Sequence, residues 1–126
     1  MLVLDSGAMT LLGERSGRAA ALIAALTEAR LWPPVVPSIL VVESVTGAGA
    51  GNLADSRFLR TCDIVDTISL SVARRAAWLR IRAQTGSAAD ALVIAIAEPG
   101  GTVLAAHLTR MRKLAAYARD VIVEPL

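Results

Sequence analysis

The 126-residue chain has the length of one domain, and its 55% hydrophobic content is enough to fill a core. Aromatic residues make up only 3%, so aliphatic side chains and alanine must build that core. The net charge is +2, but 12 of the 13 basic residues are arginine, whose guanidinium group matches phosphate oxygens. We therefore expect a single domain over residues 1–126.

Membrane insertion and secretion are not expected. The longest apolar run, residues 91–97, is far shorter than the roughly 20 residues that cross a bilayer. Asp5 interrupts the apolar N-terminus, which does not resemble a secretory signal. The single cysteine, Cys62, excludes an internal disulfide and is interpreted as a small buried apolar residue. These features predict a cytoplasmic chain with no membrane contact.

The first half of the chain alternates strands with helices. We predict a buried strand over 2–4, a helix over 6–12, a helix over 18–30, a strand over 35–36, and a helix opened by 37–38 and running from 39 to about 46. The helix over 18–30 is expected to bury Ala21, Leu22, Ala25, Leu26 and Ala29 and to end before Pro33 and Pro34. This order is typical of βα units.

The second half continues the alternation. We predict a loop over 47–51, a helix over 53–60, a brief strand between turn residues Asp63 and Asp66, a helix over 71–84 capped by Ser71, an apolar helix over 91–97, a strand over 102–105, a helix over 109–117 and a strand over 121–123. The face of the 71–84 helix that carries Val72, Ala76, Leu79 and Ala83 should be buried. Short buried strands without hairpin turns predict an α/β fold, with a parallel sheet covered by helices on both faces.

Three acidic residues are candidates for a site, and each has a local alternative. Asp5 follows the first strand, where an aspartate is also an ordinary helix N-cap. Glu43 lies beside Ile39 and Leu40 on its helix, so it either needs a cation or reaches water at the helix edge. Asp90 completes a capping box with Ser87, which explains it without any chemistry.

The predicted architecture brings these acids to a common place. Ligands of open parallel sheets bind outside the carboxyl ends of the strands, where Asp5, Glu43 and Asp90 could converge. Clustered carboxylates need a cation, and their hard oxygens suit Mg²⁺ or Mn²⁺. Such ions support hydrolysis of phosphodiesters, whereas nucleophile elbows, P-loops and dinucleotide-binding glycine motifs do not occur in the sequence.

The sequence resembles PIN-domain nucleases, and among them the VapC-type toxins of bacterial toxin–antitoxin systems. The segments that carry the resemblance are residues 3–8, 36–43, and 85–95 with its Thr85-Gly86 pair. The resemblance implies a PIN-like three-layer α/β/α fold with a short parallel sheet of four or five strands. It also implies a Mg²⁺- or Mn²⁺-dependent endoribonuclease with an RNA substrate, a homodimer, and neutralisation by a cognate antitoxin. By position, Asp5 and Asp90 would be metal ligands, while Glu43 would bind the metal directly or through water and help to activate the attacking water.

The sequence departs from the family after the fourth predicted strand. Ala105-Ala106-His107 stands where the family usually carries a hydroxyl and a fourth acid, and Ser87 replaces an acid found in many relatives. His107 is a possible fourth position of the site, as a metal ligand or phosphate contact, although a single loop histidine is more often structural or solvated. We expect a weak or single-ion nuclease. The alternative is a degenerate PIN domain that binds RNA or an antitoxin without cleaving.

Overall fold

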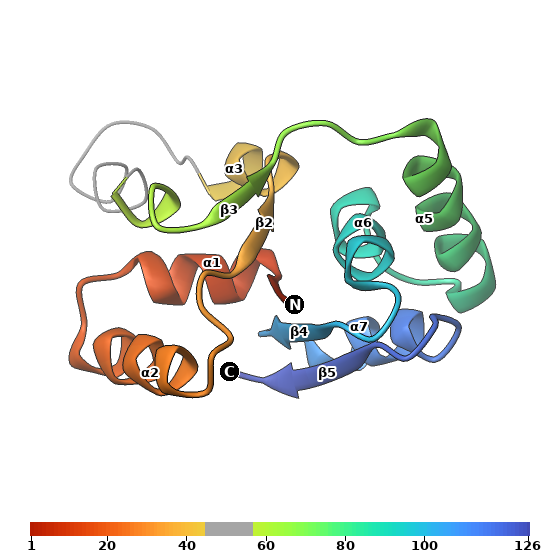
Figure 1. The fold of residues 1–126 in the computed structure, drawn as a ribbon. Coiled ribbons are helices and arrows are strands. Elements are labelled where there is room, and N and C mark those ends of the chain that lie inside the picture. The colour runs from red at the N-terminus through yellow and green to blue at the C-terminus, as the bar shows by residue number, and fades with distance from the viewer. Residues whose placement is uncertain (45–56) are drawn as a thin grey trace.

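The fold is a five-stranded, all-parallel sheet between two layers of helices, seen in a computed structural model that describes residues 1–44 and 57–126 (Figure 1). The strands run in the order β3-β2-β1-β4-β5. Their bounds are β1 Leu2–Leu4, β2 Val35–Pro37, β3 Asp63–Val65, β4 Thr102–Ala105 and β5 Ile122–Pro125. The register aligns Leu4 with Leu104 and Val36 with Ile64. The predicted PIN-like α/β architecture with a short parallel sheet is confirmed.

The helices form one layer on each face of the sheet. Their bounds are α1 Ser6–Gly13, α2 Gly17–Glu28, α3 Ile39–Ser44, α5 Leu70–Ala83, α6 Ala88–Ala97 and α7 Leu108–Ala115, and residues 57–59 are also helical. In Figure 1, α1 and α2 lie on one side of β1 and β2, and α5 and α6 lie on the other. α1 packs against α2 and α3, whereas α5, α6 and α7 pack together. None of the helices in the described ranges is long and apolar enough to cross a membrane.

Helix α6 lies at the centre of the second layer because its sequence is apolar on all sides. It contacts β1, β2 and β4, and Val93 and Ile94 are fully buried. Ser87 and Asp90 form the predicted capping box at its start. Its position brings the N-terminus of an apolar helix, with Asp90 in its first turn, next to the middle of the sheet.

The prediction of which side chains of α2 are buried is wrong in part. The side chains that pack toward the core are Ala19, Leu22, Ile23 and Leu26, whereas Ala21, Ala25 and Ala29 are exposed. Alanine contributes little buried area, so the larger Leu22, Ile23 and Leu26 decide which way the helix turns. The prediction gave alanines and large aliphatic residues equal weight.

Several predicted element ends also differ. Ser69, not Ser71, caps α5, accepting a hydrogen bond from Val72 N at 3.1 Å, although Ala76 and Leu79 are buried as predicted. Pro37 ends β2 instead of opening α3, because β2 pairs with β3 up to Val65. Asp63 is the first residue of β3, not a turn residue.

Parts of three predicted elements cannot be compared. Residues 45–46 of the predicted third helix, the predicted loop 47–51 and residues 53–56 lie outside the described residues. The other elements occur in the predicted order, and the last strand extends to Pro125 instead of ending at 123. Cys62 is half-buried, and burial raises the pKa of its thiol to about 11, so it stays a neutral thiol near neutral pH.

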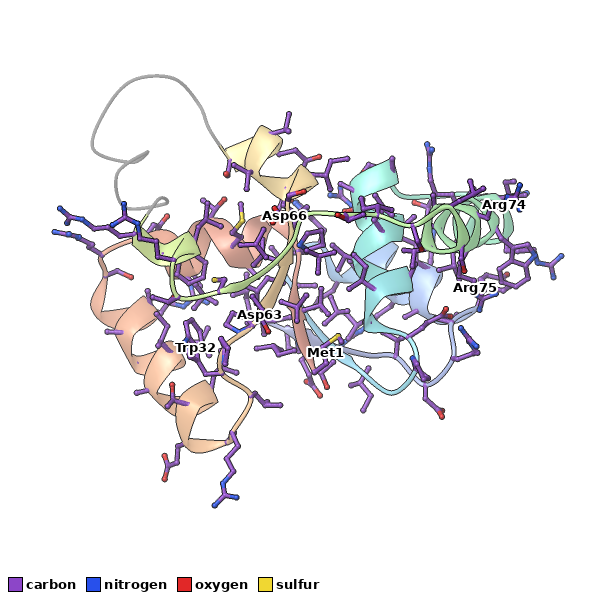
Figure 2. The ribbon with its side chains drawn as sticks, turned by 45° about the horizontal axis from the view of Figure 1, so that its top comes forward. Met1, Trp32, Asp63, Asp66, Arg74 and Arg75 are labelled. Atoms are coloured by element: carbon purple, nitrogen blue, oxygen red, sulfur yellow. The ribbon has the colours of Figure 1, made fainter. Side chains whose placement is uncertain are left out.

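The buried carboxylate of Glu98 links elements of the second helical layer through hydrogen bonds and ion pairs. The Glu98 side chain is 1% exposed and accepts hydrogen bonds from Arg75 Nη2 at 2.7 Å and from the Arg119 backbone N–H at 2.8 Å. Arg75 belongs to α5, while Arg119 precedes β5. Figure 2 shows Arg74 and Arg75 on α5, on the side of the molecule away from Trp32. Burial alone would raise the pKa of Glu98, but the two arginines outweigh it and hold the pKa below 4.5.

Because the folded-state pKa of Glu98 is lowered, its contribution to stability is present above pH 4.5 and is lost as the pH falls through the lower folded value. We expect Glu98→Gln to reduce the free energy of unfolding at pH 7 by about 1–3 kcal/mol. The difference from the natural chain should shrink below pH 4.5. Urea unfolding across pH measures this, with the exposed Glu28→Gln as the control. A pH-independent difference would contradict the assignment.

Candidate functional site

The candidate site lies at the carboxyl ends of β1 and β4, the neighbouring strands at the centre of the sheet. From β1 the chain proceeds to β2 on one side, and β4 lies on the other, so the strand order reverses here. Connections that leave in opposite directions open a crevice at this point. Asp5 follows β1, and Ala106 and His107 follow β4, so all three belong to this crevice.

Asp5 is 1% exposed and joins the two strand ends. Its Oδ1 accepts the Ala8 N–H at 2.7 Å and thereby caps α1. Its Oδ2 accepts the N–H groups of Ala106 at 2.9 Å and His107 at 3.4 Å. No basic side chain among residues 1–44 and 57–126 pairs with it. The predicted capping role is confirmed. Among the described residues, only backbone N–H groups stabilise this buried carboxylate.

Asp90 is 4% exposed and combines a cap with an ion pair. Its Oδ2 accepts the Ser87 N–H at 3.0 Å and lies 2.8 Å from Nε of Arg110. The buried Nε of Arg110 is not aligned for a hydrogen bond with any described acceptor, so the contact is one of charge. The turn before the cap requires Gly86, which has a φ of +88° and leaves no room for a Cβ beside Leu114.

Glu43 and His107 line one side of the crevice. Both border a cavity of about 510 Å³ together with Ser6, Thr10 and Glu14. Glu43 is exposed, so of its two predicted alternatives the structure shows the one in which the side chain reaches water. Its desolvation therefore gives no argument for a cation. His107 is also exposed and, as the N-cap of α7, makes no side-chain capping hydrogen bond.

The predicted residues converge on one segment, residues 106–110, but do not form a closed cluster. Asp5 contacts its backbone, Asp90 contacts its Arg110, and Glu43 shares a cavity with its His107. Within the described part of the chain, no group of three His, Cys, Asp or Glu side chains is gathered so as to hold a metal ion. The acids thus surround the β4–α7 junction without meeting.

The donor atoms nevertheless suit a hard cation. Oδ1 of Asp90 accepts no hydrogen bond from any residue in the described ranges. Asp5 brings a buried negative charge that has no cationic side chain against it in the same ranges. Oxygen ligands with positions left for water are the set that Mg²⁺ and Mn²⁺ use. The carboxylates of Asp5 and Asp90 offer oxygens of this kind, and Arg110 would compete with an ion for Asp90.

Arg110 is the site residue that sequence reasoning did not assign. The basic group Arg110, Arg112 and Lys113 directly follows the fourth strand, and this was the available signal. Helical spacing could not show that Arg110 alone turns back toward Asp90. That contact depends on the packing of α7 against α6.

Comparison with models of known protein families gives no match to this chain, and no curated protein matches it. The resemblance to PIN-domain nucleases therefore rests on the short motifs around Asp5, Glu43 and Asp90.

The contribution of Asp5 to the stability of the fold can be measured separately from any activity. Asp5→Ala removes the α1 cap and leaves the N–H groups of Ala106 and His107 without their acceptor, so we expect a loss of about 2–4 kcal/mol in the free energy of unfolding. Ser16→Ala removes only the cap of α2 and should cost about 1 kcal/mol. Both are measured by urea denaturation. Equal losses would show that the bonds from Asp5 to the 106–107 backbone contribute nothing.

Proposed function

We propose that the chain is a PIN-like, Mg²⁺- or Mn²⁺-dependent endoribonuclease and acts as the cytoplasmic toxin of a type II toxin–antitoxin system. One observation carries the catalytic part of this proposal. Asp5 and Asp90, the two predicted metal ligands, are the only charged residues among those described that are buried as whole residues. Both contact the segment 106–110 at the crevice of the sheet.

The comparison with Glu98 strengthens this argument. The Glu98 carboxylate is equally buried, but two arginines pair with it, as expected of a structural group. Asp5 has no such partner among the described residues, and the Arg110 that faces Asp90 makes no aligned hydrogen bond. Burying an unpaired carboxylate is costly, and such charges concentrate at functional sites. The site acids are thus distinguished from a structural acid of the same chain.

Each acid has a proposed role. Asp5 and Asp90 would hold the ion, which when bound supplies charge neutralisation at the phosphate and lowers the pKa of a water molecule. Glu43 is exposed beside the same cavity as His107 and would accept a proton from the attacking water. His107 would contact the phosphate.

A homodimer and binding of a cognate antitoxin complete the proposal. They rest on the family resemblance, and the surface offers places for protein contacts. Leu70, Trp78 and Ile81 of α5 are 64%, 43% and 73% exposed, and Val42 of α3 is 78% exposed. Exposed apolar side chains that gather on one helix are typical of surfaces that a partner covers.

The test of the nuclease is metal-dependent cleavage of RNA by the natural chain and by Asp5→Asn. We expect cleavage with Mg²⁺ or Mn²⁺ that falls to background in the variant, because the amide cannot supply the negative charge. Asp63→Asn is the matched control, since Asp63 is exposed at the start of β3, near Met1 at the opposite end of the sheet (Figure 2). Cleavage that survives Asp5→Asn at all metal concentrations would reject the nuclease.

A second candidate is a non-catalytic domain that binds RNA or an antitoxin. The ion pair between Arg110 and Asp90 favours it, because the chain itself supplies a cation where a metal ion would bind.

His107→Asp separates the two candidates by metal affinity. If the missing fourth acid limits metal binding, calorimetry should show tighter Mn²⁺ binding, by about tenfold for one added charged ligand. The exposed Thr109→Asp, which adds the same charge two residues further along, is the control. Unchanged Mn²⁺ affinity in His107→Asp would place residue 107 outside any metal site and favour the binding module.

A further inference from the structure

A second feature of the crevice is a basic pocket at the start of α7. It has a volume of about 440 Å³, and its lining includes His107, Thr109, Arg110 and Lys113, together with Thr85 from the turn before α6. No acidic side chain lines it. His107 also borders the cavity that contains Glu43, so the pocket adjoins the acidic part of the crevice.

Helix α7, which lines this pocket, and helix α5, which packs against α7, carry a large share of the positive charge. α5 contains four arginines and α7 contains Arg110, Arg112 and Lys113, and neither helix contains an acidic residue. These seven groups are more than half of the 13 basic residues of the chain. A concave surface lined by one sign of charge concentrates ligands of the opposite sign.

The groups in the pocket are suited to a phosphate. Lys113 is exposed and makes no ion pair with a described residue, while Arg110 lines the pocket with a side chain that is 40% exposed, although its Nε lies against Asp90. His107 provides no side-chain cap for α7, and the first residues of this helix, Leu108, Thr109 and Arg110, line the pocket. The Thr109 hydroxyl can add a further donor.

A second cavity lies next to this pocket. A volume of about 460 Å³, lined by Ala77, Arg80, Ile81, Gln84, Thr85 and Gly86, shares Thr85 with the first. Arg80 donates from Nε to the Gly86 carbonyl at 3.2 Å, which fixes this cation at the rim. The two cavities therefore adjoin at Thr85, with Arg110 and Lys113 lining one and Arg80 and the exposed Ile81 lining the other, and together they are called the basic path.

We propose that this path binds the backbone of single-stranded RNA, with one phosphodiester held by Arg110 and Lys113 beside the acidic site. The inference rests on the proposed RNA substrate and names the basic residues that bind it. Arg110 then has two anionic partners, Asp90 and the RNA phosphate, and lies between them. Arg80 would contact the backbone further along the strand.

The test uses RNA binding in EDTA, so that no cleavage is needed. Affinity of the intact chain for a labelled oligouridylate of about 12 nucleotides is measured by fluorescence anisotropy between about 50 and 200 mM salt. Lys113→Ala should lower the affinity about five- to tenfold and reduce the slope of log K against log salt by about 0.7, the value for one phosphate contact on a single strand. Arg110→Gln should act in the same direction, and the double variant should lose about twice the slope.

The control is Arg112→Ala. Arg112 is exposed on the same helix, next to Lys113, but lines neither cavity, so its loss should change the affinity by less than about twofold. Equal effects of Arg112→Ala and Lys113→Ala would overturn the proposal, as would a natural chain with no measurable RNA binding. Lys113-dependent binding without Asp5-dependent cleavage would retain the path and reject the nuclease.

Discussion

The carboxylate of Asp5 is the interaction on which the centre of this structure depends. It accepts N–H groups from Ala8, Ala106 and His107, which belong to the start of α1 and to the exit from β4. The Asp5 backbone N–H also donates to Leu104 at 3.1 Å, so this one residue fixes β1 against β4 through both its main chain and its side chain. The close approach leaves no space for a side chain at Gly7, whose Cβ would overlap that of Ala106. The crevice is therefore shaped by the same residue that supplies its first acid.

Charge balance separates the acids of this chain into two kinds. Glu98 is neutralised by Arg75 and Arg119 and holds α5 and the segment before β5 to the end of α6. Asp5 is balanced only by the dipoles of backbone N–H groups, and Asp90 contacts the Nε of Arg110, whose side chain is 40% exposed. The Arg110 side chain is partly solvated and its Nε is poorly aligned with Asp90. Replacing Arg110 by another cation at Asp90 therefore costs less free energy than breaking the ion pairs of Glu98. The crevice is the part of the described structure where charge is least fixed.

Most of the fold could be predicted from the sequence, because short apolar strands, caps and proline breaks are local signals. The N-cap at Asp5, the capping box of Ser87 and Asp90 and the strand positions beside them followed from such signals. The buried face of α2 did not, since Leu22, Ile23 and Leu26 outweigh the alanines only once the sheet is present to pack against. The sequence also left the exposure of Glu43 undecided, because the exposure of a residue on a short helix depends on neighbours far away in the chain. The pairing of Arg110 with Asp90 required the docking of α7 on α6, which no spacing rule contains.

The choice of histidine or an acid at position 107 bears on both halves of the crevice, because His107 borders both cavities. An acid at this position would add negative charge to the acidic side and would repel phosphate from the pocket that holds Arg110 and Lys113. With no acid in its lining, that pocket keeps the positive charges of Arg110 and Lys113, and its charge balance favours an anion over a cation. Under the proposed function, a histidine at position 107 would therefore weaken affinity for a divalent ion and strengthen affinity for the RNA backbone. A domain built this way would bind RNA before it binds a metal ion. The RNA phosphate would draw Arg110 away from Asp90, and the Asp90 carboxylate would then be free to bind the ion.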